Sequence, residues 1–270
     1  MSRYVVESTS SLPGPPPVSA SASNHPRSVR ENADIESSSE DYARRFLGSV
    51  GRWLLEQQTQ LTLRALDGLP TGSSILDVGG GHAQVAPPLI DAGYEVTVVG
   101  SDPVCAGRLG PWLEAGRCRF HVADLQRLPY PDAGFAAVVC YRLLPHSVDW
   151  KRLLAELCRV SAQRVVVDYP SLQSVNRASE QLFGLKQRIE RGTARPFALF
   201  DRAEVRRAFA DSGFSVREEQ PQFLWPMSLH RLTRSARVSR SLEWPGRVLG
   251  LTRRWGSPVI VRADRVVPRP

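Results

Sequence analysis

The sequence predicts an α/β protein built on a doubly wound, mostly parallel sheet. Short apolar runs alternate with helical segments between residues 75 and 168, in a repeated strand-helix order. The first strand leads directly into Gly79, Gly80 and Gly81, and the second ends at Asp102. This arrangement is typical of a nucleotide-binding βαβ unit, because the glycines let the backbone approach a ligand and the acid can bind ribose hydroxyls.

The composition bounds the size and setting of the protein. A chain of 270 residues with 42% hydrophobic residues can form one α/β domain with extensions. No apolar run approaches the roughly 18 residues of a membrane span, and the N-terminus lacks the apolar core of a signal peptide. The four cysteines have no metal-site spacing, so we expect reduced thiols, a cytoplasmic location and no bound metal. The net charge of +8 comes from arginine and is weak evidence for nucleic-acid binding.

Three regions are expected along the chain. Residues 1–36 are rich in Ser, Pro and Ala, and we expect a disordered tail there. Residues 37–70 are expected to form a helical cap of two helices, which begins at the serines and acids of 37–41. The apolar residues of the first helix share one face: Phe46, Val50, Trp53 and Leu54. Residues 71–270 form the main domain.

The main domain contains the remaining elements. From short apolar runs we expect strands at 75–78, 95–99, 118–122, 135–140, 164–168, 214–217 and 258–262. Helical segments at 83–92, 104–115 and 150–160 lie in three of the four connections between the first five strands. A variant of the capping box, Asp-x-x-Glu from Asp201, begins a helix before the sixth strand.

The glycine turn distinguishes two classes of nucleotide cofactor. A dinucleotide fingerprint that starts at Gly79 would place Gly or Ala at position 84, where the sequence has Gln84. The frame that fits is acid-x-Gly-x-Gly-x-Ala, with Asp77, Gly79, Gly81 and Ala83. In this frame the sequence resembles the class I methyltransferases that use S-adenosylmethionine (SAM), and most of all the small-molecule branch with the ubiquinone and menaquinone C-methyltransferases. A glycine turn without a ligand is the alternative.

The resemblance implies the cofactor and the residues that bind it. SAM carries an ammonium group, which the acid Asp77 suits. The segment FHVADLQRLPYPDAGFAAVV resembles a family pattern in which the acid, here Asp124, binds the adenine amino group and Leu125 lies against the ring. The candidate cofactor-binding residues are therefore Asp77, Gly79, Gly80, Gly81, Asp102, Pro103, Asp124, Leu125 and Tyr141. The resemblance also implies a Rossmann-like sheet of seven strands whose last strand is antiparallel.

The residues after the fourth strand are candidates for the chemistry. In the family this position forms the mouth of the active site, and here it reads YRLLPH from Tyr141 to His146. An oxygen or carbon acceptor can need a general base. We expect His146 as that base and Tyr141 as a second candidate, with a packing role as the alternative for His146. In the cap, Tyr42, Arg44 or Arg45 could reach the methionine carboxylate.

Two segments, 171–200 and 223–255, are longer than plain connections need, and we interpret them as helical insertions that form an acceptor pocket or lid. Their apolar residues include Phe197, Phe200, Trp225 and Met227. The second insertion combines such residues with seven arginines and one acid, which suits a cover over an apolar substrate or a surface for anionic lipid headgroups. A solvated packing helix is the alternative.

Missing motifs exclude several methyltransferase classes. The Asp/Asn-Pro-Pro-aromatic motif of amino-methylating nucleic-acid enzymes is absent after strand four, and the chain has no Pro-Cys dipeptide of the cytosine-C5 enzymes. We therefore expect O- or C-methylation of a small, hydrophobic acceptor, and no nucleic-acid substrate. An NAD(P)-dependent Rossmann oxidoreductase and a non-catalytic SAM-binding protein are the alternatives. The sequence does not indicate an oligomeric state.

Overall fold

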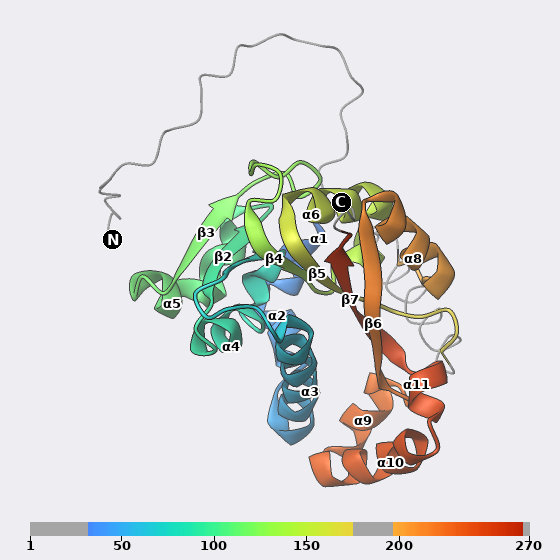
Figure 1. Cartoon of the computed structure of the whole chain (residues 1–270). Coiled ribbons are helices and arrows are strands. Elements are labelled where there is room, and N and C mark those ends of the chain that lie inside the picture. Colours follow the sequence, from blue (N-terminus) through green and yellow to red (C-terminus); the bar gives the residue numbers. More distant parts are fainter. Residues whose placement is uncertain (1–31, 175–196, 267–270) are drawn as a thin grey trace.

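A seven-stranded sheet of order β3-β2-β1-β4-β5-β7-β6 forms the centre of the structure, a computed structural model that describes residues 32–174 and 197–266 (Figure 1). The strands are β1 Ser74–Val78, β2 Glu95–Gly100, β3 Cys118–Val122, β4 Phe135–Cys140, β5 Ser161–Tyr169, β6 Phe214–Phe223 and β7 Ser257–Arg265. Strands β1 to β5 pair in parallel, and β7 runs antiparallel between β5 and β6. The doubly wound sheet with an antiparallel last strand is confirmed.

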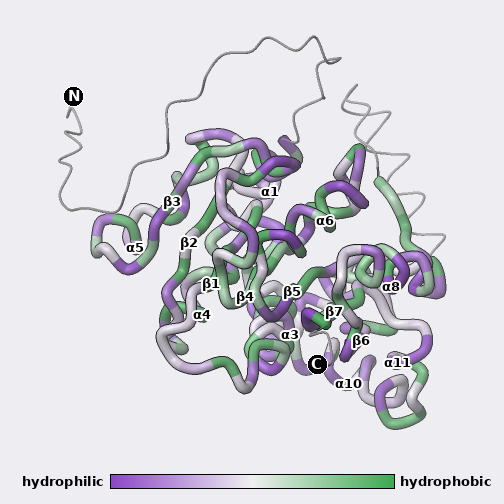
Figure 2. The backbone as a smooth tube through the Cα atoms, turned by 45° about the horizontal axis from the view of Figure 1, so that its top comes forward, coloured by the Kyte–Doolittle hydropathy of each residue, from purple (hydrophilic) through white to green (hydrophobic). Residues whose placement is uncertain are grey.

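Helices cover both faces of the sheet. The helices of the described residues are α1 Ala33–Ser37, α2 Glu40–Arg44, α3 Gly48–Leu66, α4 Ala86–Asp91, α5 Gly110–Glu114, α6 Trp150–Val160, α8 Arg202–Asp211, α9 Met227–Thr233, α10 Ala236–Val248 and α11 Leu251–Trp255. Short 3₁₀ turns lie at η1 Gly80–His82, η2 Pro103–Leu109 and η3 Leu144–His146. Purple and green alternate along α6 and α8 (Figure 2), as expected for helices with one buried face.

Side chains alternate between the two faces along each strand, since the period of a strand is two residues. Leu76 and Val78 of β1 pack in the cluster that includes residues of α6 and α8, whereas Ile75 packs with residues of α3 and α4. Val138 and Val139 of β4 point to opposite faces and are both fully buried. This is why the central strands are apolar without interruption.

The N-terminal region differs from the expectation in two ways. Residues 33–36, the end of the predicted disordered tail, belong to helix α1, because Asp34 makes buried hydrogen bonds to a distant loop that composition does not reveal. The cap is divided at another point than predicted: α2 ends at Arg44, and α3 runs without a break from Gly48 to Leu66. Residues 1–31 and most of the insertion after β5 (175–196) lie outside the described residues.

The insertion after β6 is helical, as predicted, and consists of α9, α10 and α11. Its anchor is Glu243, a carboxylate that is only 1% exposed. The Glu243 carboxylate accepts hydrogen bonds from the backbone N–H groups of Leu224 and Trp225, and its Oε1 lies 2.9 Å from His230 Nε2. These contacts hold α9 and α10 against the end of β6. In the described ranges, no helix is both long and apolar enough to cross a membrane.

Candidate active site

The glycine turn after β1 has a backbone that requires glycine. Gly79 adopts a φ of +74°, in the left-handed region, and its N–H donates to the Val99 carbonyl at 2.8 Å. A Cβ atom on Gly80 would lie 2.0 Å from Asp77 Oδ2. A side chain is therefore excluded at position 80 as long as the Asp77 carboxyl group lies against the turn.

Asp77 is a buried acid with an unused oxygen. It is 1% exposed, and Oδ2 has no hydrogen-bond partner among the described residues. Burial raises the pKa of Asp77 from its usual value to about 7. A cationic donor such as the ammonium group of SAM would supply the missing partner and favour the carboxylate, so this residue fits the expected cofactor.

The other expected cofactor residues lie at the carboxyl ends of β2 and β3. Asp102 is partly exposed and caps η2, since its Oδ1 accepts from the Val104 N–H at 2.9 Å. The neighbouring Pro103 is exposed. Asp124 accepts from the Gln126 N–H at 3.0 Å, and the next residue, Leu125, is fully buried in the core. The two acids thus follow neighbouring strands on the same side as the glycine turn.

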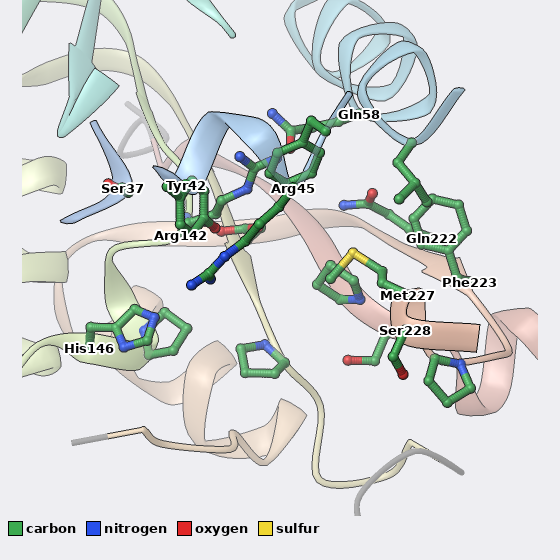
Figure 3. Close-up of a pocket in the computed structure, with 18 of the residues that line it drawn as sticks. Ser37, Tyr42, Arg45, Gln58, Arg142, His146, Gln222, Phe223, Met227 and Ser228 are labelled. Atoms are coloured by element: carbon green, nitrogen blue, oxygen red, sulfur yellow. The ribbon is translucent and has the colours of Figure 1, made fainter. Parts of the chain in front are cut away.

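A cavity of about 300 Å³ opens at the carboxyl ends of β4, β5 and β6, and we call it the strand-end cavity (Figure 3). Polar residues on its wall include Arg142 after β4, Asp168 at the end of β5 and Gln222 at the end of β6. Its apolar wall is formed by Leu54, Phe46, Phe197, Phe223, Met227 and several prolines. Ligands of doubly wound proteins bind at this edge of the sheet.

Helix α1 lies between the glycine turn and the strand-end cavity. Asp34 accepts hydrogen bonds from the N–H and the hydroxyl of Ser101, at 2.7 and 2.5 Å, and from the Cys105 thiol at 3.3 Å. A Cβ atom on Gly79 would lie 3.5 Å from Asp34 Cβ. Ala33 lines the cavity and packs in the same core cluster as Leu125. As a result, none of the nine expected cofactor residues lines the described cavity itself.

His146 and Asp168, on the strand side of the cavity wall, are two groups that suit proton transfer. His146 is half-buried at the end of η3, and its ring centre is 5.6 Å from that of Phe197. Burial raises the pKa of Asp168 to about 6, although the Arg142 backbone N–H donates to its Oδ1 at 2.6 Å and opposes that rise. The structure therefore adds Asp168 to the predicted His146.

Tyr141 lies elsewhere. Its side chain packs in the core cluster that includes residues of α3 and α4, and its hydroxyl is 2.6 Å from Thr62 Oγ1. Burial raises the pKa of the Tyr141 phenol far above its usual range. Of the residues predicted from the sequence for chemistry, the structure brings His146 to the cavity and places Tyr141 behind it, where it joins β4 to α3.

Arg142 is the residue that joins the two parts of the site. Its backbone φ is +61°, which is uncommon for a residue other than glycine. The guanidinium donates to Gln58 Oε1 of α3 at 2.7 Å and to Gln84 Oε1 of the glycine turn. Gln84 Nε2 also lies 3.0 Å from His82 Nε2. Burial, together with the nearby charge of Arg142, lowers the pKa of His82 to about 3. Gln84, the residue that does not fit the dinucleotide fingerprint, thus connects the glycine turn to Arg142 on the cavity wall.

The predicted pocket residues of the insertions divide into two groups. Phe197 and Met227 line the cavity, as expected. Phe200 is buried beneath it against Trp150, and Trp225 lies 39% exposed at the surface, so neither forms the wall. The strand-end positions of Gln222 and Phe223 could have indicated the cavity, but they fall where the sequence predicted the insertion to begin.

The structure is thus an α/β protein in which the candidate cofactor residues lie beside a separate cavity. A family model described as "Methyltransferase domain" matches residues 50–219. The chain belongs to this family, and it is a class I SAM-dependent methyltransferase with SAM as its cofactor, as predicted. This assignment sets aside the oxidoreductase alternative.

Individual proteins similar to this chain are also named methyltransferases. Demethylmenaquinone methyltransferase of Deinococcus radiodurans is 34% identical over 103 residues, which cover 36% of this chain and only 43% of that protein. Two structures of magnesium protoporphyrin IX methyltransferase from Synechocystis, one with bound SAH and one with bound SAM, superpose with TM-scores of 0.57 and 0.55 at 18% and 16% identity. They cover 84% and 86% of this chain, and 94% and 97% of their own chains. At this identity the likeness shows the fold.

Proposed function

We propose that this enzyme methylates an oxygen or a carbon atom of a small, mainly apolar molecule that binds in the strand-end cavity. The observation that carries the proposal is the cavity itself, whose exposed lining surface is mainly apolar, although arginine, carboxylate, amide and serine groups also line it. The names of the relatives mention demethylmenaquinone and magnesium protoporphyrin IX, both small molecules. All four cysteines are buried and free, which supports the expected cytoplasmic location.

In this proposal, different residues bind the cofactor, bind the acceptor and accept the proton. Bound SAM supplies an activated methyl group. Asp77, Asp102 and Asp124 hold the cofactor, together with the glycine turn that follows Asp77. Phe223 and Met227 bind the acceptor and exclude water, and His146 takes the proton that an oxygen or carbon acceptor loses.

Incubation of the full chain with methyl-labelled SAM and fractions of a metabolite extract tests this function. Label in a small, organic-soluble product is the expected result. Label in nucleic acid or protein alone, or no transfer to any fraction, would refute the proposal, and the latter result would favour the non-catalytic SAM-binding alternative.

Replacement of His146 by alanine is expected to lower kcat by about 10²- to 10⁴-fold, the usual contribution of a general base. SAM affinity, measured by calorimetry, is expected to stay the same, since His146 is not among the proposed cofactor residues. His121→Ala is the matched control, because His121 lies on β3, bonded to Tyr130 and away from the cavity. A larger loss of kcat in Asp168→Asn than in His146→Ala would assign the proton to Asp168 instead.

The outer face of α9 to α11 suits contact with an anionic lipid surface. On α10, Arg237, Trp244 and Val248 lie opposite the buried residues Ser239 and Glu243. Trp244 is 66% exposed, and apolar exposure continues at nearby positions: Leu232, Val238, Leu249 and Trp255. Exposed apolar residues among arginines are typical of helices that lie in the lipid headgroup region.

In a flotation assay, vesicles that contain anionic lipid are expected to carry the protein upward. Vesicles of neutral lipid are expected to leave it at the bottom. Trp244→Ser and Arg237→Gln should each weaken this binding severalfold, since a basic residue near such a surface contributes about 1 kcal/mol. The control Arg119→Gln changes an exposed arginine on β3, at the other edge of the sheet. An equal loss in that control, or no flotation at all, would contradict a specific lipid face.

A further inference from the structure

Three arginines from separate segments meet at the wall of the strand-end cavity. Arg45 follows α2, Arg142 follows β4, and Arg231 lies on α9. Their guanidinium groups gather around one pair of rings, Tyr42 and Phe46, and Figure 3 shows Arg45, Arg142 and Tyr42 close together. The Cζ atom of Arg45 is 4.8 Å from the Tyr42 ring centre, and those of Arg142 and Arg231 are 4.4 and 5.6 Å from the Phe46 ring centre.

The described hydrogen bonds of the Arg142 and Arg231 guanidinium groups go to neutral acceptors, although the charge of Arg142 also acts on the nearby Asp168 carboxyl group. The Arg142 guanidinium donates to the neutral amides of Gln58 and Gln84, and Arg231 Nε donates to the Arg45 carbonyl at 3.2 Å. In the part of the chain that the structure describes, neither Arg142 nor Arg231 forms a salt bridge. Both can therefore accept an anionic partner without breaking an ion pair described here.

Two carboxylates share the cavity wall with the three arginines. Glu36 lies 3.9 Å from Arg45, at the limit of a salt bridge, and Asp168 accepts from a backbone N–H. The pKa of Arg231 lies below its usual value because of burial and because of the charges of Arg45 and Arg142, while the Tyr42 hydroxyl opposes the shift. Like charges held close together at the cavity wall favour a bound anion.

We propose that the methyl acceptor carries an oxyanion, a carboxylate or a phosphate ester, which Arg231 and Arg142 bind while its apolar body lies against Phe223 and Met227. The planar guanidinium matches both oxyanions with two parallel hydrogen bonds, which an ammonium group cannot do. The inference rests on the proposed function and specifies its substrate class.

Calorimetric titrations of the full chain, saturated with SAH to prevent turnover, test the inference with three probes of equal chain length. Octanoate and octyl phosphate offer the two oxyanions, and octanol offers the same apolar body without charge. At least one anion is expected to bind tenfold or more tightly than octanol, as one charge-assisted pair allows. The anion that binds more tightly shows whether the acceptor carries a carboxylate or a phosphate ester. In Arg231→Gln this preference is expected to disappear, with octanol binding unchanged.

Two further variants define the outcome. Arg231→Lys keeps the charge but loses the paired donors, and it is expected to retain only part of the preference. Arg253→Gln removes an exposed arginine of α11 outside the cavity and is expected to change nothing. Equal binding of anions and octanol to the wild type would overturn the inference. A parallel loss of SAH affinity in Arg231→Gln would also overturn it, because Arg231 would then bind the cofactor.

The failure of this inference and that of the proposed function are distinguishable. Methyl transfer to a neutral small molecule, with no preference for anionic probes, would leave the proposed function intact and refute only the oxyanion. No binding of any octyl probe, together with no transfer in the extract, would refute both.

Discussion

Replacement of Asp102 by alanine is expected to weaken SAM binding by one to two orders of magnitude while the sheet stays folded. Asp102 is the partly exposed acid at the end of β2, where ribose hydroxyls bind in proteins of this architecture. Each charge-assisted hydrogen bond lost contributes about 1.5–3 kcal/mol, and about 1.4 kcal/mol corresponds to a tenfold change in affinity. Calorimetric titration with SAM measures the effect, and a melting curve checks the fold.

Asp102→Asn separates the two roles of this side chain. The amide oxygen can still accept from the Val104 N–H and cap η2, as the carboxylate does. We therefore expect Asp102→Asn to melt like the wild type and yet to bind SAM more weakly, because it lacks the negative charge. A folded Asp102→Ala protein with unchanged SAM affinity would contradict the assignment of this residue.

Glu243→Ala is expected to lower the free energy of unfolding by about 3–5 kcal/mol, the usual result of removing one member of a buried, hydrogen-bonded polar network. The substitution leaves the N–H groups of Leu224 and Trp225 and the His230 ring without their buried acceptor. Urea denaturation measures the loss. Since α9 carries Met227 and Arg231 to the cavity, acceptor binding is expected to weaken more than SAM binding.

Glu56→Ala is the matched control for that experiment. Glu56 pairs with Arg240 across 3.8 Å, and both side chains are more than half exposed. An exposed pair of this kind contributes at most about 1 kcal/mol. If the two alanine variants had similar stability, Glu243 would not be the anchor of the insertion.

Local patterns predicted the elements of this protein, and distant contacts decided the site. The strands, the glycine turn and the acids after β2 and β3 follow from apolar runs and short spacings, so the sequence alone was sufficient for them. The docking of α1 depends on Asp34 and Ser101, which are 67 residues apart, and the link from Arg142 to Gln58 spans 84 residues. No pattern within a single segment contains such pairs.

The dependence on contacts between distant segments also explains why some residues were predicted at the wrong place in the site. Phe200 and Trp225 are large and apolar, as pocket residues are, but size does not tell a cavity wall from the core beneath it or from the surface. Tyr141 directly follows a central strand, and the side on which its ring packs depends on Thr62 of α3. Arg231 reads as one of seven arginines in the insertion, and only the packing of α9 brings it to Phe46.

The contact between Asp34 and Cys105 makes that cysteine a chemical reporter. While α1 is docked, the thiol is fully buried and donates to Asp34, and both burial and the carboxylate raise its pKa to about 11. Alkylating reagents attack the thiolate, so labelling at neutral pH is slow in this state. Release of α1 would remove the carboxylate that helps to raise this pKa. The alkylation rate of Cys105 therefore measures how often α1 leaves the glycine turn, with the three other buried cysteines as internal references.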